Sequence, residues 1–369
     1  MSISGFMAKL LRAIWYGLDT LRRVLHLVLL LALFIAVLAG LVSGVAPVPS
    51  TVALVISPGG ALVEQLEGSP IDRAIAQFNN QAEPQTLVRD VTDSLDYAAK
   101  DDRIKTVVLD LDGLESGGLA KLQTIAQAID KVRAAGKKVI AFGNGYTRDQ
   151  YYLASRADEV IMHDLGMVYL EGYEYYRMFF KNALDKLFID VNIFKVGEYK
   201  SFVEPFIRND MSAADREASQ RWIGSLWGAW ERDVSAARGL EVKALDDYSN
   251  EFAGHIEDAG GHAAKAAIAA HLVDRTMSRP EFDDYITGMV GPDDAGDGSY
   301  SSIGFKEYLA ATAIERKLAE PHERNVAIIV AAGEIVDGEA PPGTVGGNTL
   351  AYQIREARLD DSVDAVVLR

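Results

Sequence analysis

Apolar and polar positions alternate in blocks along the first half of the chain. Four short runs are apolar and largely β-branched, as in strands buried on both faces of a parallel sheet: residues 51–56, 104–111, 138–142 and 159–162. Apolar residues recur at helical spacing between these runs, in residues 87–98, 119–132 and 150–157. Because strands and helices alternate at the spacing of βαβ units, the pattern predicts an α/β fold with a parallel sheet and right-handed crossovers.

The pattern becomes mainly helical after residue 211. Ser212, followed three residues later by Asp215, is typical of a helix start. Three large side chains then share one helical face, and we interpret them as core or interface residues: Trp222, Leu226 and Trp230. Alanine-rich helix is expected over residues 243–279, a polar, glycine-rich linker over 291–302, and one more helix over 305–318.

The beginning of the α/β pattern then recurs. Residues 325–330 resemble residues 51–56 at an offset of 274, and residues 360–368 resemble residues 101–109 at an offset of 259. We interpret this as a duplication of one α/β unit, with a shorter connection in the second copy. The second copy stops at Arg369, inside its second strand, which predicts that the sequence is the front part of a longer chain.

The N-terminus has the composition of a transmembrane helix. Residues 27–42 are sixteen consecutive residues without a polar side chain, and the mainly apolar stretch from 24 to 48 exceeds the length needed to cross a bilayer. The positive-inside rule places residues 1–23 in the cytoplasm, because four basic residues face one acidic residue there: Lys9, Arg12, Arg22 and Arg23 against Asp19. The alternative is a signal peptide that is cleaved at the small residues 43–46.

The sequence therefore predicts four parts. They are a cytoplasmic N-terminus with a membrane anchor at residues 1–49, a first repeat with a helical extension at 50–290, a linker and helix at 291–324, and the start of a second repeat at 325–369.

Charge and composition exclude several kinds of chemistry. The net charge of −16 disfavours nucleic acid as a partner, because binding to phosphates requires a positive surface. The absence of cysteine excludes disulfides, thiolate nucleophiles and cysteine-ligated zinc. The six histidines show no metal-ligand spacing, and the sequence contains no phosphate-binding glycine motif. We therefore expect no metal and no cofactor.

The stretch 194–206 is the candidate for catalytic chemistry. It places Lys200 among strand-forming phenylalanine, valine and tyrosine residues. A lysine that acts as a general base must be neutral, and apolar surroundings lower the pKa of a lysine. Two nearby carboxylates, Glu198 and Glu204, would raise that pKa unless they point elsewhere or pair with Arg208.

Other interpretations of this stretch stay open. An exposed lysine whose stem covers apolar surface is an ordinary structural feature. Lys195 is a rival candidate for the base. Ser201 is a candidate nucleophile next to Lys200, although adjacent side chains diverge in extended backbone.

The sequence GEYKSFVEPF at residues 197–206, together with the anchor and the duplicated unit, resembles the signal peptide peptidase A family in its long, duplicated form. That family is similar in fold to the Clp proteases and crotonases, and its members are serine proteases with a Ser–Lys dyad. The resemblance implies that Lys200 is the general base and that the serine comes from the second half. In the first half Arg148 stands where the serine would be, so the resemblance places the nucleophile near position 407, beyond Arg369.

The resemblance implies a membrane-anchored serine endopeptidase that degrades cleaved signal peptides. These apolar peptides suit a site lined by Phe194, Phe202, Val203 and Phe206. The resemblance further implies a ring-shaped homo-oligomer in the bacterial inner membrane, with the main domain in the periplasm or outside the cell. Residues 1–369 alone are then expected to be inactive. The alternatives are a non-catalytic, membrane-bound scaffold of the same fold and a crotonase-like acyl-CoA enzyme.

Overall fold

The computed structural model describes residues 3–42, 46–197, 199–293, 298–319 and 325–369. Its description of side chains further leaves out residues 3–14, 36–42 and 319. The chain divides into two compact units, Met1–Pro47 and Val48–Arg369.

In the first unit the described residues form one helix, α1 (Ile3–Val42), and the start of the connection to the second unit. Asp19 pairs with both Arg22 and Arg23 on this helix, at 2.9 and 2.7 Å. Within the residues that the structure describes, no helix is both long enough and apolar enough to cross a membrane. The predicted anchor at residues 1–49 includes positions 36–45, which lie outside the described side chains.

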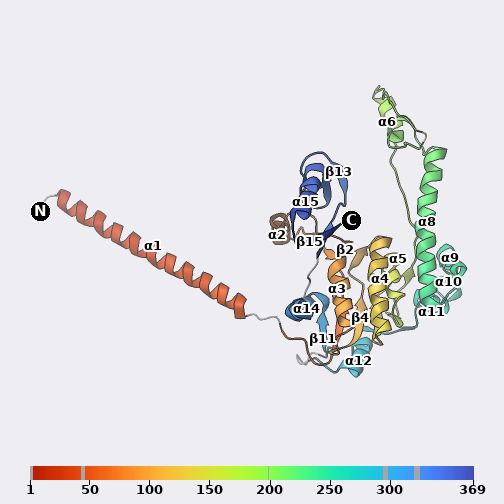
Figure 1. Ribbon diagram of the computed structural model, residues 1–369, viewed down its shortest axis with the longest axis horizontal. Coiled ribbons are helices and arrows are strands. Elements are labelled where there is room, and N and C mark those ends of the chain that lie inside the picture. The colour runs from red at the N-terminus through yellow and green to blue at the C-terminus, as the bar shows by residue number, and fades with distance from the viewer. Residues whose placement is uncertain (1–2, 43–45, 198, 294–297, 320–324) are drawn as a thin grey trace. The chain divides into compact units, whose positions relative to one another are not determined.

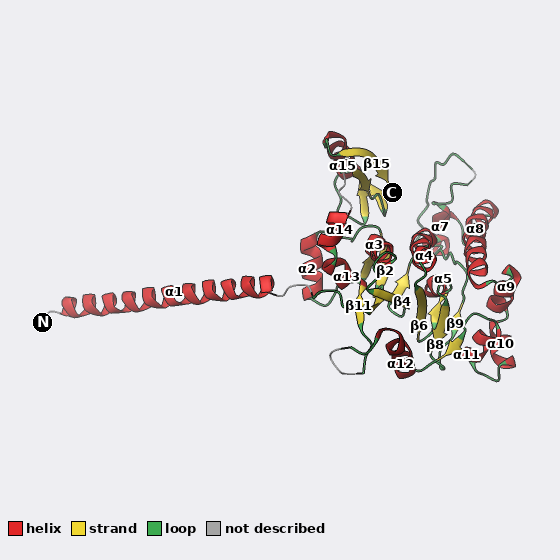
Figure 2. Ribbon diagram, turned by 60° about the horizontal axis from the view of Figure 1, so that its bottom comes forward, coloured by secondary structure: helices red, strands yellow, loops and turns green. Residues whose placement is uncertain are grey.

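The second unit is built around a six-stranded sheet in which every pairing is parallel (Figure 2). The strand order is β10-β8-β6-β4-β1-β11. Its strands are β1 (Val52–Ile56), β4 (Ile104–Asp110), β6 (Lys138–Gly143), β8 (Glu159–Met162), β10 (Arg275–Thr276) and β11 (Ser302–Gly304). The four inner strands agree within one residue with the apolar runs of the sequence, so the predicted α/β fold with a parallel sheet is confirmed.

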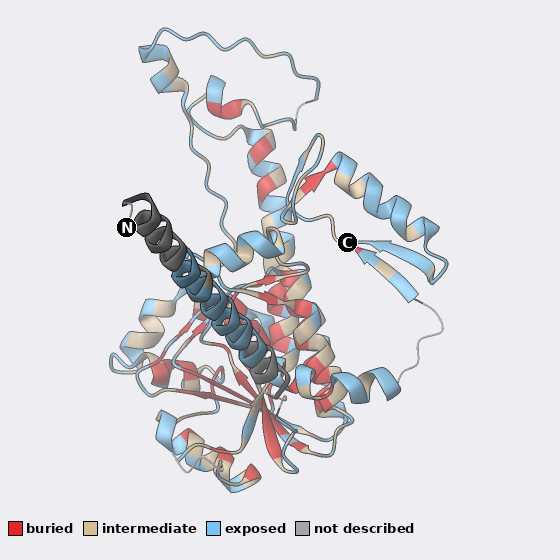
Figure 3. Cartoon of the chain, turned by 90° about the vertical axis from the view of Figure 1, so that its left-hand side faces the viewer, coloured by how far each residue is buried: buried red, intermediate tan, exposed pale blue. Residues whose placement is uncertain are grey.

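Helices cover both faces of this sheet, and Figure 3 shows the buried strands between them. Alternate residues of β1 face opposite ways. Val52, Leu54 and Ile56 belong to the main core, whereas Ala53 packs in a second cluster with Phe282. The main core is covered by α3 (Val88–Ala98) and α4 (Leu119–Ala134), and the second cluster by α12 (Arg279–Val290). Burial on both faces explains why these strands are continuously apolar.

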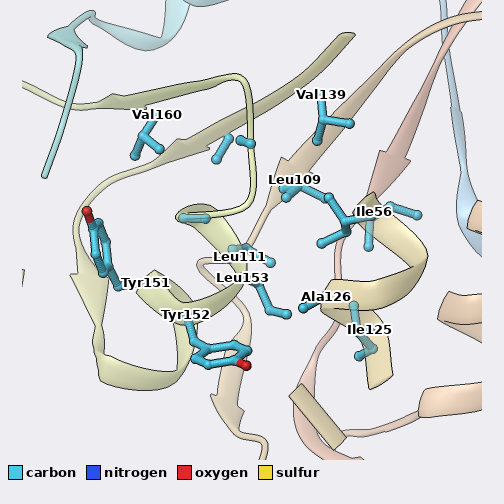
Figure 4. Close-up of a cluster of buried hydrophobic side chains, with 14 of the residues drawn as sticks. Ile56, Leu109, Leu111, Ile125, Ala126, Val139, Tyr151, Tyr152, Leu153 and Val160 are labelled. Carbon is cyan, nitrogen blue, oxygen red and sulfur yellow. The ribbon is translucent and has the colours of Figure 1, made fainter. Parts of the chain in front are cut away.

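The helix that follows β6 lies deep in the main core. This helix, α5 (Arg148–Ala154), starts with a capping box between Thr147 and Gln150. Tyr151 and Tyr152 are fully buried and pack with aliphatic side chains of the sheet and of α4 (Figure 4). The Tyr152 hydroxyl donates a hydrogen bond of 2.6 Å to Asp233, which ties α5 to the long helix α8 (Ala213–Arg238).

The second repeat has the same strand pairing as the first. In the first repeat β1 pairs with β4, and the register shifts directly after Val52, which faces Ile104. In the second, β12 (Asn325–Ile329) pairs with β15 (Val363–Leu368), and the register shifts directly after Asn325, which faces Val363. The predicted offset of 259 is confirmed by this pairing. The predicted offset of 274 is one too large, because the pairing aligns Val52 with Asn325, 273 residues apart.

The difference in length between the two repeats is located at one helix of the first repeat. The pair of β2 (Gly60–Val63) with β3 (Gln85–Leu87) corresponds to the pair of β13 (Glu334–Val336) with β14 (Thr344–Gly346). Twenty-one residues join the first pair and seven join the second, so the first copy is 14 residues longer. The extra residues contain α2 (Pro70–Phe78), a capped helix without a buried residue. Each copy continues into a helix, α3 in the first and α15 (Gly347–Leu359) in the second.

The helical region differs from its prediction in two places. The expected helix over 243–279 is divided into three helices before the chain returns to the sheet as β10: α9 (Val242–Asn250), α10 (Phe252–Asp258) and α11 (Ala263–Ala269). The segment 291–324, predicted as linker and helix, adds to the first sheet. It contributes the edge strand β11 and two helices, α13 (Phe305–Ala311) and α14 (Ala313–Ala319). Residues 294–297 and 320–324 lie outside the described part.

Candidate active site

Lys200 lies on a long excursion from the first repeat. The chain leaves the body after β9 (Val168–Tyr169) and returns at α8 (Figure 1). The excursion contains two short helices, α6 (Lys181–Lys186) and α7 (Glu204–Ile207). The strand-forming residues around Lys200 form no strand among the described residues 194–197 and 199–203, because no neighbouring strand offers them hydrogen-bond partners. Figure 3 shows this part of the excursion largely in the exposed colour, with a buried turn at α7.

The backbone and the stem of Lys200 are held by nearby residues. The Lys195 amine donates a hydrogen bond of 3.3 Å to the carbonyl of Lys200. Gly197 has a φ of +108°, and a Cβ atom at this glycine would lie 3.7 Å from Cγ of Lys200. The Lys200 stem therefore folds back over Gly197. Lys195, the rival candidate for the base, supports the Lys200 backbone in this arrangement.

Lys200 lines an open cavity of about 670 Å³. Three of the four predicted lining residues are present there, Phe194, Phe202 and Val203, together with Tyr199. The fourth, Phe206, instead stacks on Phe180, with ring centroids 6.2 Å apart. The expected apolar enclosure of Lys200 is not formed: the lysine is exposed, and the Phe194 and Phe202 side chains are 97% and 83% exposed.

The Glu204 carboxylate is directed to the start of α8. This carboxylate is buried and accepts a hydrogen bond of 3.0 Å from the backbone N–H of Ser212. Burial acts to raise the pKa of Glu204, but hydrogen bonding from Ser212 and the charges of Arg208 and Lys195 outweigh it and hold the pKa below its usual value. Arg208 itself pairs with Asp210 at 2.8 Å. Glu198 lies outside the described residues.

Arg148 occupies the first residue of α5, inside the body of the first repeat. Its guanidinium lies 4.0 Å from the ring centre of Tyr173 and pairs with Asp149 at 2.9 Å. Its carbonyl accepts a hydrogen bond of 3.3 Å from the indole of Trp230. Trp230 is fully buried, so it belongs to the core and takes no part in an exterior interface. The Arg148–Asp149 ion pair therefore fills the place that the family resemblance gives to a serine.

Asp149 is a site residue that the sequence did not single out. Its Oδ2 atom accepts a hydrogen bond of 2.9 Å from the backbone N–H of Gly117. Gly117 and the following Gly118 stand just after β5 (Leu114–Ser116), where a glycine pair can form either a turn or a cradle for an oxyanion. The N–H of Gly117 does face the start of α5, but it already donates its hydrogen bond to the Asp149 carboxylate. The described residues hold no group of three or more His, Cys, Asp or Glu side chains that could bind a metal.

Comparison with known proteins connects this geometry to a peptidase family. Residues 131–285, which include α5, Lys200 and α8, match the family model Peptidase family S49. The chain is 36% identical to Protease 4 of Salmonella typhi over 310 residues, which are 84% of this chain and 48% of that protein. It is 34% identical to Protease 4 of Haemophilus influenzae, covering 84% of this chain and 52% of that protein. The chain thus spans about half the length of these relatives.

Two more distant similarities accompany these. Serine protease SPPA, chloroplastic, of Arabidopsis thaliana is 24% identical over 85% of this chain and 45% of that protein. Among solved structures, an enoyl-CoA hydratase from Geobacillus kaustophilus has 14% identity and a TM-score of 0.28, over 55% of this chain and 64% of that chain. On the sequence relatives and the S49 match, the chain belongs to peptidase family S49, among proteins of the signal peptide peptidase A type.

Proposed function

We propose that this chain supplies the general base of a serine endopeptidase, with Lys200 as that base and the nucleophilic serine in the second repeat beyond Arg369. The observation that carries the proposal is the position of Lys200: it lies inside the S49-matching region and lines an open cavity together with Phe194 and Phe202. A neutral lysine amine takes the proton of the serine hydroxyl as the oxygen attacks a peptide carbonyl. The same amine then returns the proton to the leaving amine.

The first repeat cannot provide the nucleophile at α5, because Arg148 and Asp149 occupy that place. Its role in the proposal is to carry the lysine and to support the second repeat, whose described strands repeat the pairing of the first. An oxyanion hole of backbone N–H groups would come from the second repeat, since Gly117 already donates to Asp149. In this arrangement the first repeat provides the lysine of the Ser–Lys dyad, and the second repeat provides the serine and the oxyanion hole.

The proposed substrates are apolar peptides, namely signal peptide remnants. Two accessible aromatic side chains beside Lys200, Phe194 and Phe202, support this substrate class, because exposed apolar surface gains stability when an apolar partner covers it. The same surface supports a homo-oligomer, in which neighbouring subunits would cover the rest of the excursion. We further propose that the parallel sheet has the form that is found in Clp proteases and crotonases.

The proposed location is the bacterial inner membrane, with one anchor and the main domain outside the cytoplasm. The support is the sequence of residues 27–42, which carry no polar side chain, and the basic residues that precede them. Apolar peptides released within a membrane would be within reach of a site anchored beside it.

Substitution of Lys200 tests the proposed function. In the full-length protein, Lys200→Ala should lower peptide hydrolysis by about 10²- to 10⁴-fold, the usual contribution of a general base. The fold should persist, because Lys200 is exposed. Lys186→Ala, which removes another exposed lysine of the same excursion, is the matched control and should retain most of the activity. Wild-type rates in Lys200→Ala would overturn the assignment, and a full-length wild-type protein without hydrolytic activity would favour the scaffold.

A further inference from the structure

The excursion that carries Lys200 is closed at its base by partly buried polar contacts at the start of α8. Ser212 is the N-cap residue of this helix, and its hydroxyl accepts a hydrogen bond of 3.1 Å from the Asp215 N–H. Glu204 accepts one from the Ser212 N–H at 3.0 Å, and Asp215 accepts one from Arg177 at 3.1 Å. These four residues, Arg177, Glu204, Ser212 and Asp215, are called the α8 clasp below.

The α8 clasp joins both limbs of the excursion to one helix end. Arg177 lies on the outgoing limb before α6, and Glu204 lies on the returning limb four residues after Lys200. Glu204 and Asp215 are only 3% and 7% exposed. Both carboxylates stand at the N-terminus of a 26-residue helix, where the helix dipole and the free N–H groups favour negative charge. The clasp is therefore a fixed point at the base of an otherwise exposed segment.

Glu204 is the member of the clasp that connects directly to the lysine-bearing turn. Its own backbone N–H donates a hydrogen bond of 2.9 Å to the carbonyl of Ser201, the residue after Lys200. A second backbone contact stands beside it, between the N–H of Phe180 and the carbonyl of Pro205 at 2.7 Å. Glu204 thus holds the turn with its main chain and holds α8 with its side chain.

We propose that Glu204 is a positioning residue for Lys200, whose buried carboxylate fixes the lysine-bearing turn to the N-terminus of α8 and so sets the direction of the Lys200 amine. The inference rests on the proposed function, in which Lys200 is the general base. A general base must lie within hydrogen-bond reach of the proton that it removes, and a displacement of about 1 Å can cost about 10²-fold in rate. Glu204 contributes to turnover in this way without touching the substrate.

A carboxylate near a lysine can also act through its charge, and two conservative substitutions separate the two roles. Glu204→Gln keeps the length of the side chain and an oxygen that accepts from Ser212, but removes the charge. Glu204→Asp keeps the charge but is one methylene too short to span the same distance. A positioning role predicts that the glutamine variant works and the aspartate variant does not. A charge role instead predicts that the aspartate variant works and that the glutamine variant shifts the acidic limb of the pH–rate profile to lower pH, because the pKa of a nearby lysine falls when a negative charge is removed.

The test is the steady-state kinetics of the full-length protein on a fluorogenic apolar peptide, measured over a range of pH. We expect Glu204→Asp to lower kcat by about tenfold or more with KM within about twofold, because the base is misplaced while the substrate still binds. We expect Glu204→Gln to keep at least about half of the wild-type kcat and to leave the acidic limb of the pH–rate profile in place. Circular dichroism confirms folding of each variant.

Glu231 supplies the matched control. It is a buried glutamate on α8, 7% exposed and far along the helix from the clasp. Glu231→Asp should leave kcat unchanged even where it lowers the melting temperature. An equal loss of kcat in both aspartate variants would overturn the proposal, since it would reflect general damage to α8.

Three further outcomes would also decide the matter. Wild-type kcat in Glu204→Asp would overturn the positioning role. A pH–rate profile that shifts to lower pH in Glu204→Gln would overturn it in favour of charge, because removal of a negative charge lowers the pKa of a nearby lysine. Lys200→Ala is measured alongside, because it tests the proposed function separately from the positioning role. An inactive Lys200→Ala with an unaffected Glu204→Asp rejects only the positioning role. An active Lys200→Ala rejects the proposed function itself.

Discussion

The backbone N–H of Gly117 donates a hydrogen bond of 2.9 Å to Oδ2 of Asp149, inside the first repeat. Asp149 in turn pairs with Arg148, at the position that the family resemblance gives to a nucleophile. Backbone N–H groups next to a nucleophile are the usual components of an oxyanion hole. Here the donor is satisfied by a side chain of the same domain, so this N–H has a structural role in the first repeat.

Asp149 should therefore be important for the stability of the first repeat. Asp149→Ala leaves the buried N–H of Gly117 without an acceptor and leaves Arg148 without its carboxylate. We expect the free energy of unfolding to fall by about 3 kcal/mol, as for other broken, largely buried polar networks. Urea denaturation of the purified protein measures this loss.

Asp149→Asn is the control for this prediction. The asparagine still offers an oxygen to Gly117 but no charge to Arg148, so its loss should be smaller than that of the alanine variant. A stability change within about 0.5 kcal/mol in Asp149→Ala, the range typical of surface substitutions, would show that the contact contributes nothing.

Asp101 should make the first repeat sensitive to acid. It accepts hydrogen bonds from Arg103 and from the Tyr308 hydroxyl, which link the turn before β4 to α13. Burial acts to raise the pKa of Asp101, but these hydrogen bonds outweigh it and hold the pKa below its usual value of 3.8. Because the folded protein then binds this proton less readily than the unfolded chain, the stabilisation is complete above that value and is lost as pH falls through the folded pKa.

The measurement is the free energy of unfolding as a function of pH, for the wild type and for Asp101→Asn. The wild type should lose stability more steeply below about pH 4 than the variant, which has no carboxylate to protonate at this position. The free energies of unfolding of the two proteins should differ most near neutral pH. Parallel curves through the acid range would show that Asp101 does not contribute to the acid sensitivity.

The strands of the sheet could be predicted because their environment leaves a direct mark on the sequence. The strand β8 (Glu159–Met162) was predicted without error, since a strand buried on both faces must be apolar throughout. The edge strand β11 (Ser302–Gly304) carries no such mark and was taken for part of a linker and helix. The one-residue error in the repeat offset has a similar cause, because the hydrogen bonds and the register shift after Val52 set the alignment, and the apolar pattern does not show them.

The candidate site was less predictable than the fold. Phe194 and Phe202 have high β-propensity, but β-propensity describes how a side chain fits a paired and half-buried surface, and the excursion offers no such surface. Lys200 could be singled out from its apolar neighbours in the sequence, but its assignment as the general base came from the family resemblance. Glu204 looked like an unfavourable neighbour of the lysine, because sequence distance does not show that its carboxylate turns toward Ser212.

Gly60 should not tolerate a side chain. It has a φ of +66°, and a Cβ atom at this position would lie 1.7 Å from the carbonyl oxygen of Pro84. Its counterpart in the second repeat, Gly333, meets the same obstacle at Gly343, where the distance is 1.9 Å. Gly60→Ala should lower the free energy of unfolding by more than about 2 kcal/mol, because both backbone strain and a steric clash oppose it.

Gly136→Ala separates these two causes. Gly136 also has a positive φ, +81°, but an added Cβ atom meets nothing within 4 Å. Its substitution should cost about 1 kcal/mol, from strain alone. Thermal denaturation of both variants measures the difference, and equal losses would mean that the chain at Pro84 moves aside without cost.

The 14 additional residues around α2 should be dispensable for folding. Residues 64–84 join β2 to β3, whereas residues 337–343 join the equivalent strands of the second repeat. Replacement of 64–84 by a copy of 337–343 should therefore preserve the strand pairing. We expect the free energy of unfolding to change by less than about 1 kcal/mol, since α2 buries no residue and the partly exposed ion pair of Glu64 with Arg369 contributes little.

A deletion of equal length tests whether this tolerance belongs to α2 alone. Removal of residues 74–87 also shortens the chain by 14 residues, but it deletes β3 and with it Thr86. The Thr86 hydroxyl accepts a hydrogen bond from the N–H of Gly59 and donates one to its carbonyl, both at 2.9 Å. This second deletion should abolish cooperative unfolding, whereas the graft should retain it. Loss of cooperativity in both proteins would show that α2 is required for the first repeat to fold.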